Sequence, residues 1–271
     1  MQGRKTNFLV YSSVGDARAV SFWNEPDRNF DVCIAYYGES SFPDMDKVEY
    51  FISNKDYKVP NFVKCLKEFP AIQDYDYVLW LDDDLLVSLD SINRIFEMAE
   101  SYQLDLCQPS LMPGSDASWR HTYSKPGVLL EYVNFVEVQA PCISNRLLRQ
   151  TIPYLDIFLT DYGLDLLWWK LLQEEKDKIA VLHSVKVFHP LSSAGNSIRR
   201  INNFKSINRE VVQNLARALN EKFDGNMLLG LKVKVFGRIY SDFWRFIFWR
   251  MTSFTFMKFK LNQIRRFFRP K

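Results

Sequence analysis

Residues 75–88 read YDYVLWLDDDLLVS, and this stretch decides the fold class that the sequence predicts. The aromatic and apolar run at 75–81 is typical of a buried strand. Asp82, Asp83 and Asp84 follow this run directly, at its carboxyl end. Because neighbouring carboxylates repel one another, three of them at a strand end indicate that something positive binds among them.

Strand-like and helix-like runs alternate on either side of this stretch. Ser88 or Asp90 can cap the helix that follows the aspartates. The predicted strands are 7–13, 30–38, 47–54, 75–81, 104–111, 133–144 and 181–189, and the predicted helices are 59–70, 91–102, 147–155 and 164–178. This alternation predicts an α/β sheet with helices on its faces. In such sheets, ligands bind beyond the carboxyl ends of the strands.

Length and composition favour one sizeable core, or one domain with an extension. The chain has 271 residues, of which 47% are hydrophobic and 15% aromatic. Its four cysteines lie far apart, without the spacing of a metal site, which is typical of a reducing compartment. We find neither a signal peptide nor an apolar run of about 18 residues, so we expect a cytoplasmic protein.

The charges divide the chain into two parts. Residues 230–271 hold eleven Lys or Arg and one acid, although the whole chain carries only +3. We therefore predict a folded body at 1–229 and a basic, aromatic tail at 230–271. On a helix, Tyr240, Phe243 and Trp244 would share an apolar face edged by cations, which suits an anionic membrane surface. Docking of this helix on the body and binding to nucleic acid are the alternatives, and we expect no nucleic acid.

Asp82 and Asp84 are separated by one residue, so both can reach one hard cation from the same side. Mg²⁺ and Mn²⁺ prefer carboxylate oxygens and leave the rest of their shell to water and phosphates. Such an ion acts as a Lewis acid and stabilises a departing diphosphate. The alternative is a solvated acidic turn. We predict a Mn²⁺ or Mg²⁺ site at Asp82 and Asp84, with Asp83 beside it.

Two later segments offer further chemistry. In TDYGLDLLWW, residues 160–169, Asp165 falls in the first turn of a helix, and Trp168 can offer a flat face to a sugar ring. The alternative is that these residues cap and pack the helix. In VFHP, residues 187–190, His189 ends an apolar strand and can complete a metal shell, unless it is a core or loop histidine.

Seven sequence blocks together resemble the family of proteins of unknown function numbered 707. Members of that family look like glycosyltransferases of the A-type fold. The resemblance covers about residues 7–195 and implies a Rossmann-like mixed sheet flanked by helices. One half of it would hold a nucleotide and the other an acceptor, followed here by a C-terminal basic, aromatic helical extension. The blocks are VYSSVGD, FDVCIAYYG, YDYVLWLDDDLLV, WRHTYSKPG, VNFVEVQAPCIS, DYGLDLLW and VFHPLSSAG.

The resemblance also implies roles for single residues. In A-type glycosyltransferases the D-x-D carboxylates bind a metal and the donor diphosphate. Inverting members place a general base in a Gly-x-(Glu/Asp)-Asp segment, which matches Asp165, with Asp161 as the second choice. This sequence departs from the pattern at Leu164, where an acid is common. A late histidine on the metal matches His189.

The loop after the first strand would hold the nucleotide, because its small residues allow close approach and its acid can accept from ribose hydroxyls. We assign nucleotide binding to Ser12, Ser13, Gly15 and Asp16, together with Asp83. Trp119 and Arg120 lie in a polar segment that can contact substrate. Arg120 can pair with a phosphate or an acidic sugar, or form a surface salt bridge.

The sequence thus predicts a metal-dependent glycosyltransferase with its catalytic domain at 1–229. It would move a sugar from a nucleotide-sugar, UDP-linked, to a hydroxyl of a glycan or lipid-linked acceptor in surface polysaccharide or lipopolysaccharide synthesis, at the inner face of the membrane. One alternative is a nucleotidyltransferase, although no Gly-rich phosphate loop with a lysine follows the first strand. Another is a catalytically silent glycan- or membrane-binding protein of the same fold.

Overall fold

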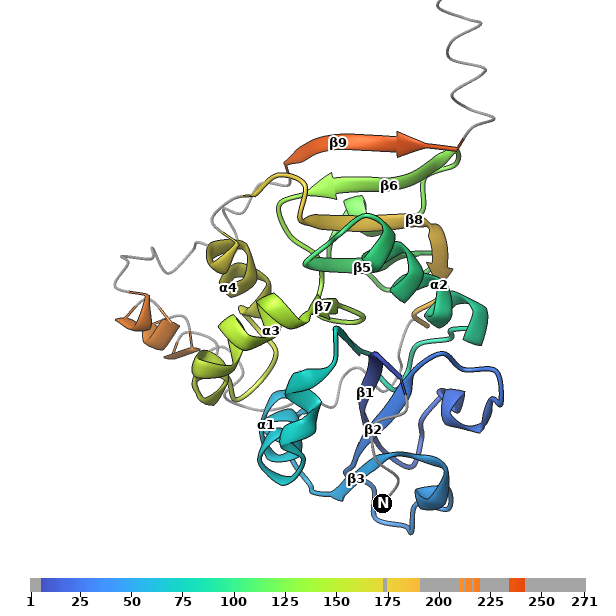
Figure 1. Ribbon diagram of the computed structural model, residues 1–271, viewed down its shortest axis with the longest axis vertical. Helices are drawn as coiled ribbons and strands as arrows, with labels where there is room; N and C mark the ends of the chain where they lie inside the picture. Colours follow the sequence, from blue (N-terminus) through green and yellow to red (C-terminus); the bar gives the residue numbers. More distant parts are fainter. Residues whose placement is uncertain are drawn as a thin grey trace, which may run out of the picture.

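The computed structural model describes residues 6–172, 175–190, 210–211, 213–215, 217–219 and 234–241 (Figure 1). Within these residues, nine strands form one sheet in the order β3-β2-β1-β4-β7-β5-β8-β6-β9. The sheet contains both parallel and antiparallel pairs and has helices packed against it. The predicted α/β architecture, a mixed sheet flanked by helices, is confirmed.

The strands of the amino-terminal half run parallel to one another. They are β1 (Phe8–Val14), β2 (Asp31–Tyr36), β3 (Tyr50–Ser53) and β4 (Tyr77–Trp80). Nearly every residue of β1 and β2 is buried, as in parallel strands that are covered on both faces. Leu9 and Tyr11 pack on one face with α1 (Lys58–Glu68), whereas Val10 packs on the other with α2 (Leu89–Ser101).

The carboxyl-terminal half of the sheet is mixed. Its strands are β5 (Leu106–Leu111), β6 (Val128–Val133), β7 (Cys142–Ser144), β8 (Ile179–Val187) and β9 (Val235–Tyr240). β7 is antiparallel to both β4 and β5 and so connects the two halves. β5 and β8 are parallel, and β6 is antiparallel to β8 and β9. The helices α3 (Asn145–Thr151) and α4 (Leu164–Leu171) share one apolar core with α1.

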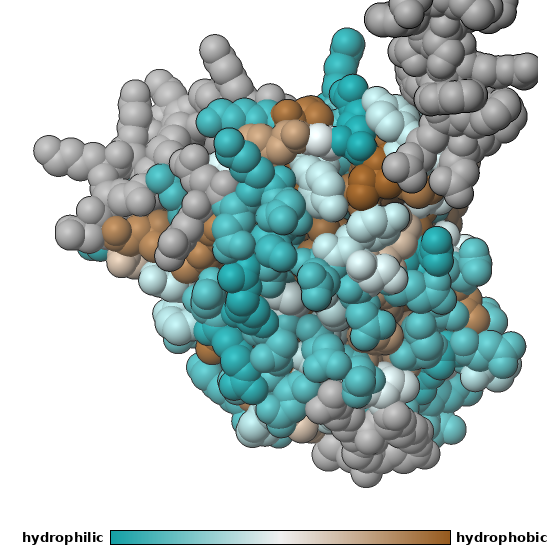
Figure 2. Space-filling model, turned by 45° about the horizontal axis from the view of Figure 1, so that its top comes forward, coloured by the Kyte–Doolittle hydropathy of each residue, from teal (hydrophilic) through white to brown (hydrophobic). Residues whose placement is uncertain are grey.

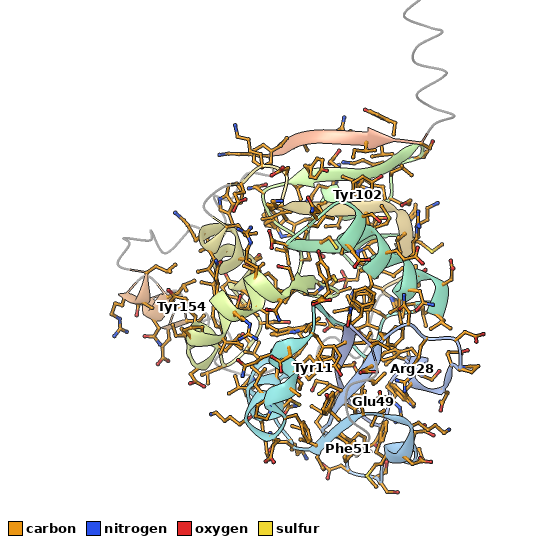
Figure 3. All side chains as sticks on the ribbon, in the orientation of Figure 1. Tyr11, Arg28, Glu49, Phe51, Tyr102 and Tyr154 are labelled. Atoms are coloured by element: carbon orange, nitrogen blue, oxygen red, sulfur yellow. The ribbon has the colours of Figure 1, made fainter. Side chains whose placement is uncertain are left out.

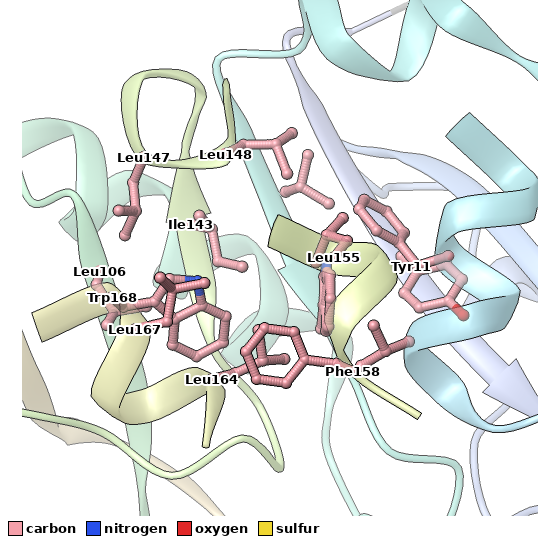
Figure 4. Close-up of a cluster of buried hydrophobic side chains, with 14 of the residues drawn as sticks. Tyr11, Leu106, Ile143, Leu147, Leu148, Leu155, Phe158, Leu164, Leu167 and Trp168 are labelled. Atoms are coloured by element: carbon pink, nitrogen blue, oxygen red, sulfur yellow. The ribbon is translucent and has the colours of Figure 1, made fainter. Parts of the chain in front are cut away.

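That shared core fixes the position of α4 against β4. Figure 4 shows Trp168 of α4 among Leu106, Ile143 and Leu167. The ring of Trp168 meets that of Trp80 edge-on, with centroids 6.3 Å apart and planes at 79°. Burying an aromatic ring removes about 150–250 Å² from water, so this contact is a large part of what holds α4 in place. The loop that precedes α4 is therefore held close to the end of β4.

Short helices and caps complete the fold. The 3-10 helices are η1 (Phe22–Asn24), η2 (Met45–Lys47), η3 (Pro70–Asp74), η4 (Arg120–Thr122) and η5 (Ile152–Ile157). The Ser88 side chain accepts a hydrogen bond from the Ser91 amide, which confirms Ser88 as the cap of α2. The Tyr11 hydroxyl donates to the Lys58 carbonyl oxygen at 2.7 Å and so ties β1 to the first turn of α1 (Figure 3).

Two predicted elements are wrong. The strand predicted at 133–144 is split, because the segment 134–141 leaves β6 and bonds to the end of β4. There the Trp80 amide donates to the Pro141 carbonyl and the Asp82 amide to the Gln139 carbonyl. Tyr240, predicted on a tail helix, belongs to strand β9, which pairs with β6. The other residues of the predicted tail, 230–233 and 242–271, lie outside the described residues.

Hydrophilic residues predominate among the coloured atoms of the face in Figure 2. The large apolar side chains that are exposed in the described part of the chain are scattered in sequence: Tyr37, Met45, Leu86, Met112, Leu159 and Val235. None of the described helices combines the length and apolar character that crossing a membrane requires.

Candidate functional site

A cavity of about 570 Å³ lies at the carboxyl ends of the parallel strands. This volume is within the range of small-molecule sites, about 300–1,000 Å³. Its wall combines residues at the end of β1 and after β2, β3 and β4 with residues of the loop ahead of α4. They include Ser13, Tyr37, Lys58, Asp82, Asp83, Asp84 and Asp161. The structure thus brings the three aspartates together with one of the two predicted base candidates.

Lys58 holds Asp82 and Asp161 on either side of its ammonium group. The Lys58 Nζ lies 2.5 Å from Asp82 Oδ1 and 3.2 Å from Asp161 Oδ2, and it also donates to the Val138 carbonyl at 2.7 Å. Burial raises the pKa of Asp82 to about 6, although Lys58 opposes the shift. Burial disfavours the charge of Lys58, but Asp82 and Asp161 outweigh it and raise its pKa. The predicted metal ligand Asp82 is therefore already paired with a cation of the chain.

Asp83 turns toward the loop after β1. Its Oδ2 accepts hydrogen bonds from the Gly15 amide at 2.8 Å and from the Tyr37 hydroxyl at 2.9 Å. A Cβ at Gly15 would lie 2.6 Å from the Tyr37 ring, so a larger residue there would require that ring to shift. Burial raises the pKa of Asp83, while the Gly15 amide and the Tyr37 hydroxyl act against the shift. Asp83 and Tyr37 therefore form one wall of the cavity, and Asp83 also ties the loop after β1 to that wall through Gly15.

Asp84 meets His189 from the other half of the molecule. His189 Nε2 lies 3.2 Å from Asp84 Oδ2, and His189 Nδ1 lies 2.9 Å from the Asp116 carbonyl oxygen. The hydrogen bond that His189 Nε2 donates to Asp84 raises the pKa of His189 to about 9, and the same bond lowers the pKa of Asp84. The sequence prediction that His189 joins the aspartates is consistent with this contact.

The donor set at this edge fits a hard cation that shares its shell with a ligand. Among the described residues, no three His, Cys, Asp or Glu side chains are grouped closely enough to hold a metal by themselves. Asp84 is 49% exposed and has His189 beside it. Mg²⁺ at nucleotide sites usually takes one or two carboxylates and fills its shell with water and phosphate oxygens. Asp84 offers an oxygen ligand for that arrangement, whereas His189 would first have to give up the proton that its contact with Asp84 favours, since a ligating imidazole is neutral.

The two base candidates differ in their surroundings. Asp161 lines the cavity and is held by Lys58. Asp165 is in the first turn of α4, where its Oδ1 accepts from the Leu166 amide at 2.9 Å. Burial raises the pKa of Asp165 to about 6, and the neighbouring charge of Asp161 acts in the same direction. A carboxyl group with a pKa near 6 can take a proton at neutral pH more readily than an ordinary aspartate.

The residues predicted to bind the nucleotide differ in whether their side chains reach the cavity. Ser13 lines the cavity, and its Oγ accepts from the Asn61 amide group at 2.9 Å. Ser12 is fully buried, and its hydroxyl donates to the Leu81 carbonyl at 2.6 Å, so it cannot meet a ligand. Asp16 accepts from Tyr36, Ser40 and the Glu39 amide. These bonds connect the loops after β1 and β2, and the bond from Ser40, followed by that from Tyr36, lowers the pKa of Asp16.

The three residues predicted to contact substrate, Trp119, Arg120 and Trp168, do not line the cavity. Trp168 is fully buried in the core, so the prediction that it stacks on a sugar is wrong. The cause is packing, because α4 turns this ring toward β4. Trp119 is half-buried and packs against Phe135, with ring centroids 4.9 Å apart. Arg120 is exposed at the start of η4. Neither Trp119 nor Arg120 is among the residues that line the cavity.

Sequence reasoning missed several residues of the cavity. Tyr37 follows β2, and Lys55, Asp56 and Tyr57 follow β3. The rule that ligands bind at the carboxyl ends of parallel strands would have found them, had it been applied to every strand. Lys58 was missed because nothing in its local sequence indicates that it pairs with acids 24 and 103 positions away.

No protein-family model matches the chain, and no curated protein matches it significantly. Among solved structures, S. aureus TarS aligns with 81% of this chain and 41% of its own, at a TM-score of 0.48 and 12% identity. S. aureus TarS 1-349 in complex with UDP-GlcNAc aligns with 81% of this chain and 68% of its own, at a TM-score of 0.48 and 11% identity. A197 from STIV aligns with 68% of this chain and 86% of its own, at a TM-score of 0.38 and 14% identity. This chain thus matches less than half of the longer TarS chain, and the resemblance to family 707 rests on the sequence blocks alone.

Proposed function

We propose that this protein is a metal-dependent glycosyltransferase that uses a nucleotide-sugar donor, UDP-linked, and a hydroxyl of a glycan or lipid-linked acceptor. One observation carries the proposal. Three consecutive aspartates at the end of β4 and Asp161 from the other half of the chain line one cavity of about 570 Å³. A site rich in carboxylates at the carboxyl ends of parallel strands suits a cation and the phosphates bound to it.

In this proposal Asp84 and Asp83 have separate tasks. Asp84 and His189 would hold Mn²⁺ or Mg²⁺, which supplies positive charge to the departing diphosphate. Asp83 fixes the loop after β1 through the Gly15 amide, and Ser13 near the end of β1 would form part of the nucleotide wall. Tyr37, with 38% of its surface exposed, offers that wall an aromatic side chain.

We assign the transfer step to Asp165, which lies in the first turn of α4 and has a raised pKa, although it is not among the residues that line the cavity. Asp165 takes the proton of the acceptor hydroxyl, the hydroxyl oxygen bonds to the anomeric carbon, and the bond between that carbon and the diphosphate oxygen breaks. The nucleoside diphosphate leaves with the bonding electrons. Attack opposite the leaving group inverts the anomeric centre. A base of this kind contributes roughly 10²–10⁴-fold to the rate.

Calorimetry with UDP, in the presence and absence of Mn²⁺, tests the function directly. We expect UDP to bind more tightly with Mn²⁺, and a UDP-sugar to be hydrolysed slowly without acceptor. A silent protein of the same fold would show neither effect. A nucleotidyltransferase would instead release pyrophosphate from a nucleoside triphosphate.

The basic, aromatic composition of 242–271 supports the proposal that the protein works at the inner face of a membrane. This segment holds eight Lys or Arg and one acid. Each basic residue near an anionic surface contributes about 1 kcal/mol. Co-sedimentation with anionic vesicles tests the idea with a chain that ends at Ser241, because β9 belongs to the sheet. We expect the full chain to bind and the shortened chain to lose binding, and equal binding by both would contradict the proposal.

A further inference from the structure

The N–H donors of the Lys58 ammonium group are directed at other groups of the protein. An ammonium group has three N–H donors. Lys58 Nζ contacts Asp82 Oδ1 at 2.5 Å, the Val138 carbonyl oxygen at 2.7 Å and Asp161 Oδ2 at 3.2 Å. Its side chain is only 10% exposed, although it lines the cavity. A lysine with three such partners acts on the site through them, rather than by holding the substrate itself.

The partners of Lys58 come from three separate segments. Asp82 follows β4, Val138 lies in the segment between β6 and β7, and Asp161 precedes α4. Lys58 itself is the first residue of α1 and is anchored to β1 through its carbonyl oxygen, which accepts from Tyr11. One ammonium group therefore connects the parallel half of the sheet with the segment that carries both base candidates.

The residues that line the cavity carry more negative than positive charge, and Lys58 offsets part of it. Five aspartates line it, at positions 56, 82, 83, 84 and 161, against the lysines Lys55 and Lys58. The Lys55 side chain is 74% exposed and pairs with Glu39, so solvent screens its charge. Lys58 is nearly buried, where a charge acts more strongly than at the surface. An anionic diphosphate that enters the cavity would meet unopposed carboxylates if Lys58 were absent.

We propose that Lys58 is a positioning residue of the donor site, which holds Asp82 and Asp161 together and offsets their charge so that a nucleoside diphosphate can enter. This inference rests on the proposed nucleotide-sugar function. It also assigns Asp161 a task apart from proton transfer: with Lys58, it closes the cavity between the two halves of the molecule.

Binding of UDP with Mn²⁺, measured by calorimetry, tests the effect on the donor. We expect Lys58→Met to weaken UDP binding about tenfold or more, because an unopposed charge at this range costs that much. Lys58→Arg keeps the charge and should bind UDP more tightly than Lys58→Met. Lys67→Met removes an exposed lysine from the same helix and should stay within about twofold of the wild type. UDP binding by Lys58→Met equal to that of the wild type would overturn the proposal.

Thermal unfolding tests the positioning itself and needs no ligand. Lys58→Met should lower the Tm, because it leaves two carboxylates without their cation. The same substitution should lower the Tm less in the Asp161→Asn background, where one of those carboxylates is neutral. Equal decreases in both backgrounds would overturn the positioning role, even if Lys58→Met folds too poorly for calorimetry. If the wild type itself binds neither UDP nor a UDP-sugar, the proposed function fails and the donor role of Lys58 fails with it, whatever the Tm values show.

Discussion

Two groups of paired charges, one lining the cavity and one buried in the sheet, differ in how many cations serve each carboxylate. At the cavity, Lys58 pairs with both Asp82 and Asp161. In the sheet, Glu131 of β6 is fully buried and pairs with two cations, Lys125 and Arg238. Burial disfavours the charge of Glu131, but Lys125 and Arg238 outweigh it and lower its pKa. Burial raises the pKa of Asp82 to about 6, with the charge of Asp161 acting in the same direction and Lys58 opposing both.

The difference separates a structural ion pair from a binding site. Glu131 and its partners satisfy one another, and Arg238 joins β9 to β6. The cavity instead keeps an excess of negative charge, which is stable only if a cation or a donor group compensates it. Perturbed carboxylates in a cavity mark functional sites more often than chance, whereas a fully compensated pair stabilises the fold.

The largest expected effect is on Asp84, whose carboxylate faces the cavity. Asp84→Ala should abolish both transfer and donor hydrolysis, because it removes the exposed oxygen ligand beside His189. The measurement is release of UDP from a UDP-sugar. Asp90→Ala, an exposed aspartate in the first turn of α2, serves as the control and should keep full activity. Transfer that survives removal of metal by a chelator would contradict the metal role.

The next effect separates the two base candidates. Asp165→Asn should lower kcat by roughly 10²–10⁴-fold with little change in the KM for the donor. The kcat/KM of the wild type should fall below about pH 6, because protonated Asp165 cannot act as a base. Asp161→Asn should instead raise the KM for the donor, since Asp161 is held by Lys58 at the cavity. A larger loss of kcat in Asp161→Asn would identify Asp161 as the base.

Substitution of Glu131, which pairs with Lys125 and Arg238 in the sheet, should change stability but not UDP binding. Glu131→Gln should lower the free energy of unfolding by about 1–3 kcal/mol, because two cations lose their buried partner. Its affinity for UDP should remain that of the wild type. Chemical denaturation and calorimetry on the same preparation measure both quantities. A change in UDP affinity would show that this cluster also belongs to the site.

The smallest effect is a pH dependence of stability caused by Asp165. Burial raises its pKa from the ordinary value of 3.8 to about 6, so the folded protein keeps a proton that the unfolded chain has already lost. The destabilising effect of Asp165 on the folded state therefore grows as pH rises from about 4 to 6, and it is complete above about pH 6. Asp165→Asn should raise the free energy of unfolding by about 1–3 kcal/mol at pH 8 and change it little at pH 4. Equal effects at both pH values would contradict the assigned pKa.

Much of the fold could be predicted because it depends on local patterns. The apolar run before Asp82 predicted β4, and Ser88 predicted the start of α2. Prediction failed at 133–144, where an apolar run was taken as one strand although it passes the end of β4 on the way from β6 to β7. It failed again at Tyr240, where β6 offered an edge with which an amphipathic segment could pair.

By itself, the sequence determined that three carboxylates stand at the end of a buried strand, since charge and hydrophobic pattern are local properties of neighbouring residues. The tertiary structure alone decided which side chains compensate them. Lys58, Asp161 and His189 are distant in sequence from the aspartates they approach, and only the packing of α4 and β8 brings the last two there. It also decided that Trp168 fills the core, because the direction of a helical side chain depends on what its helix packs against.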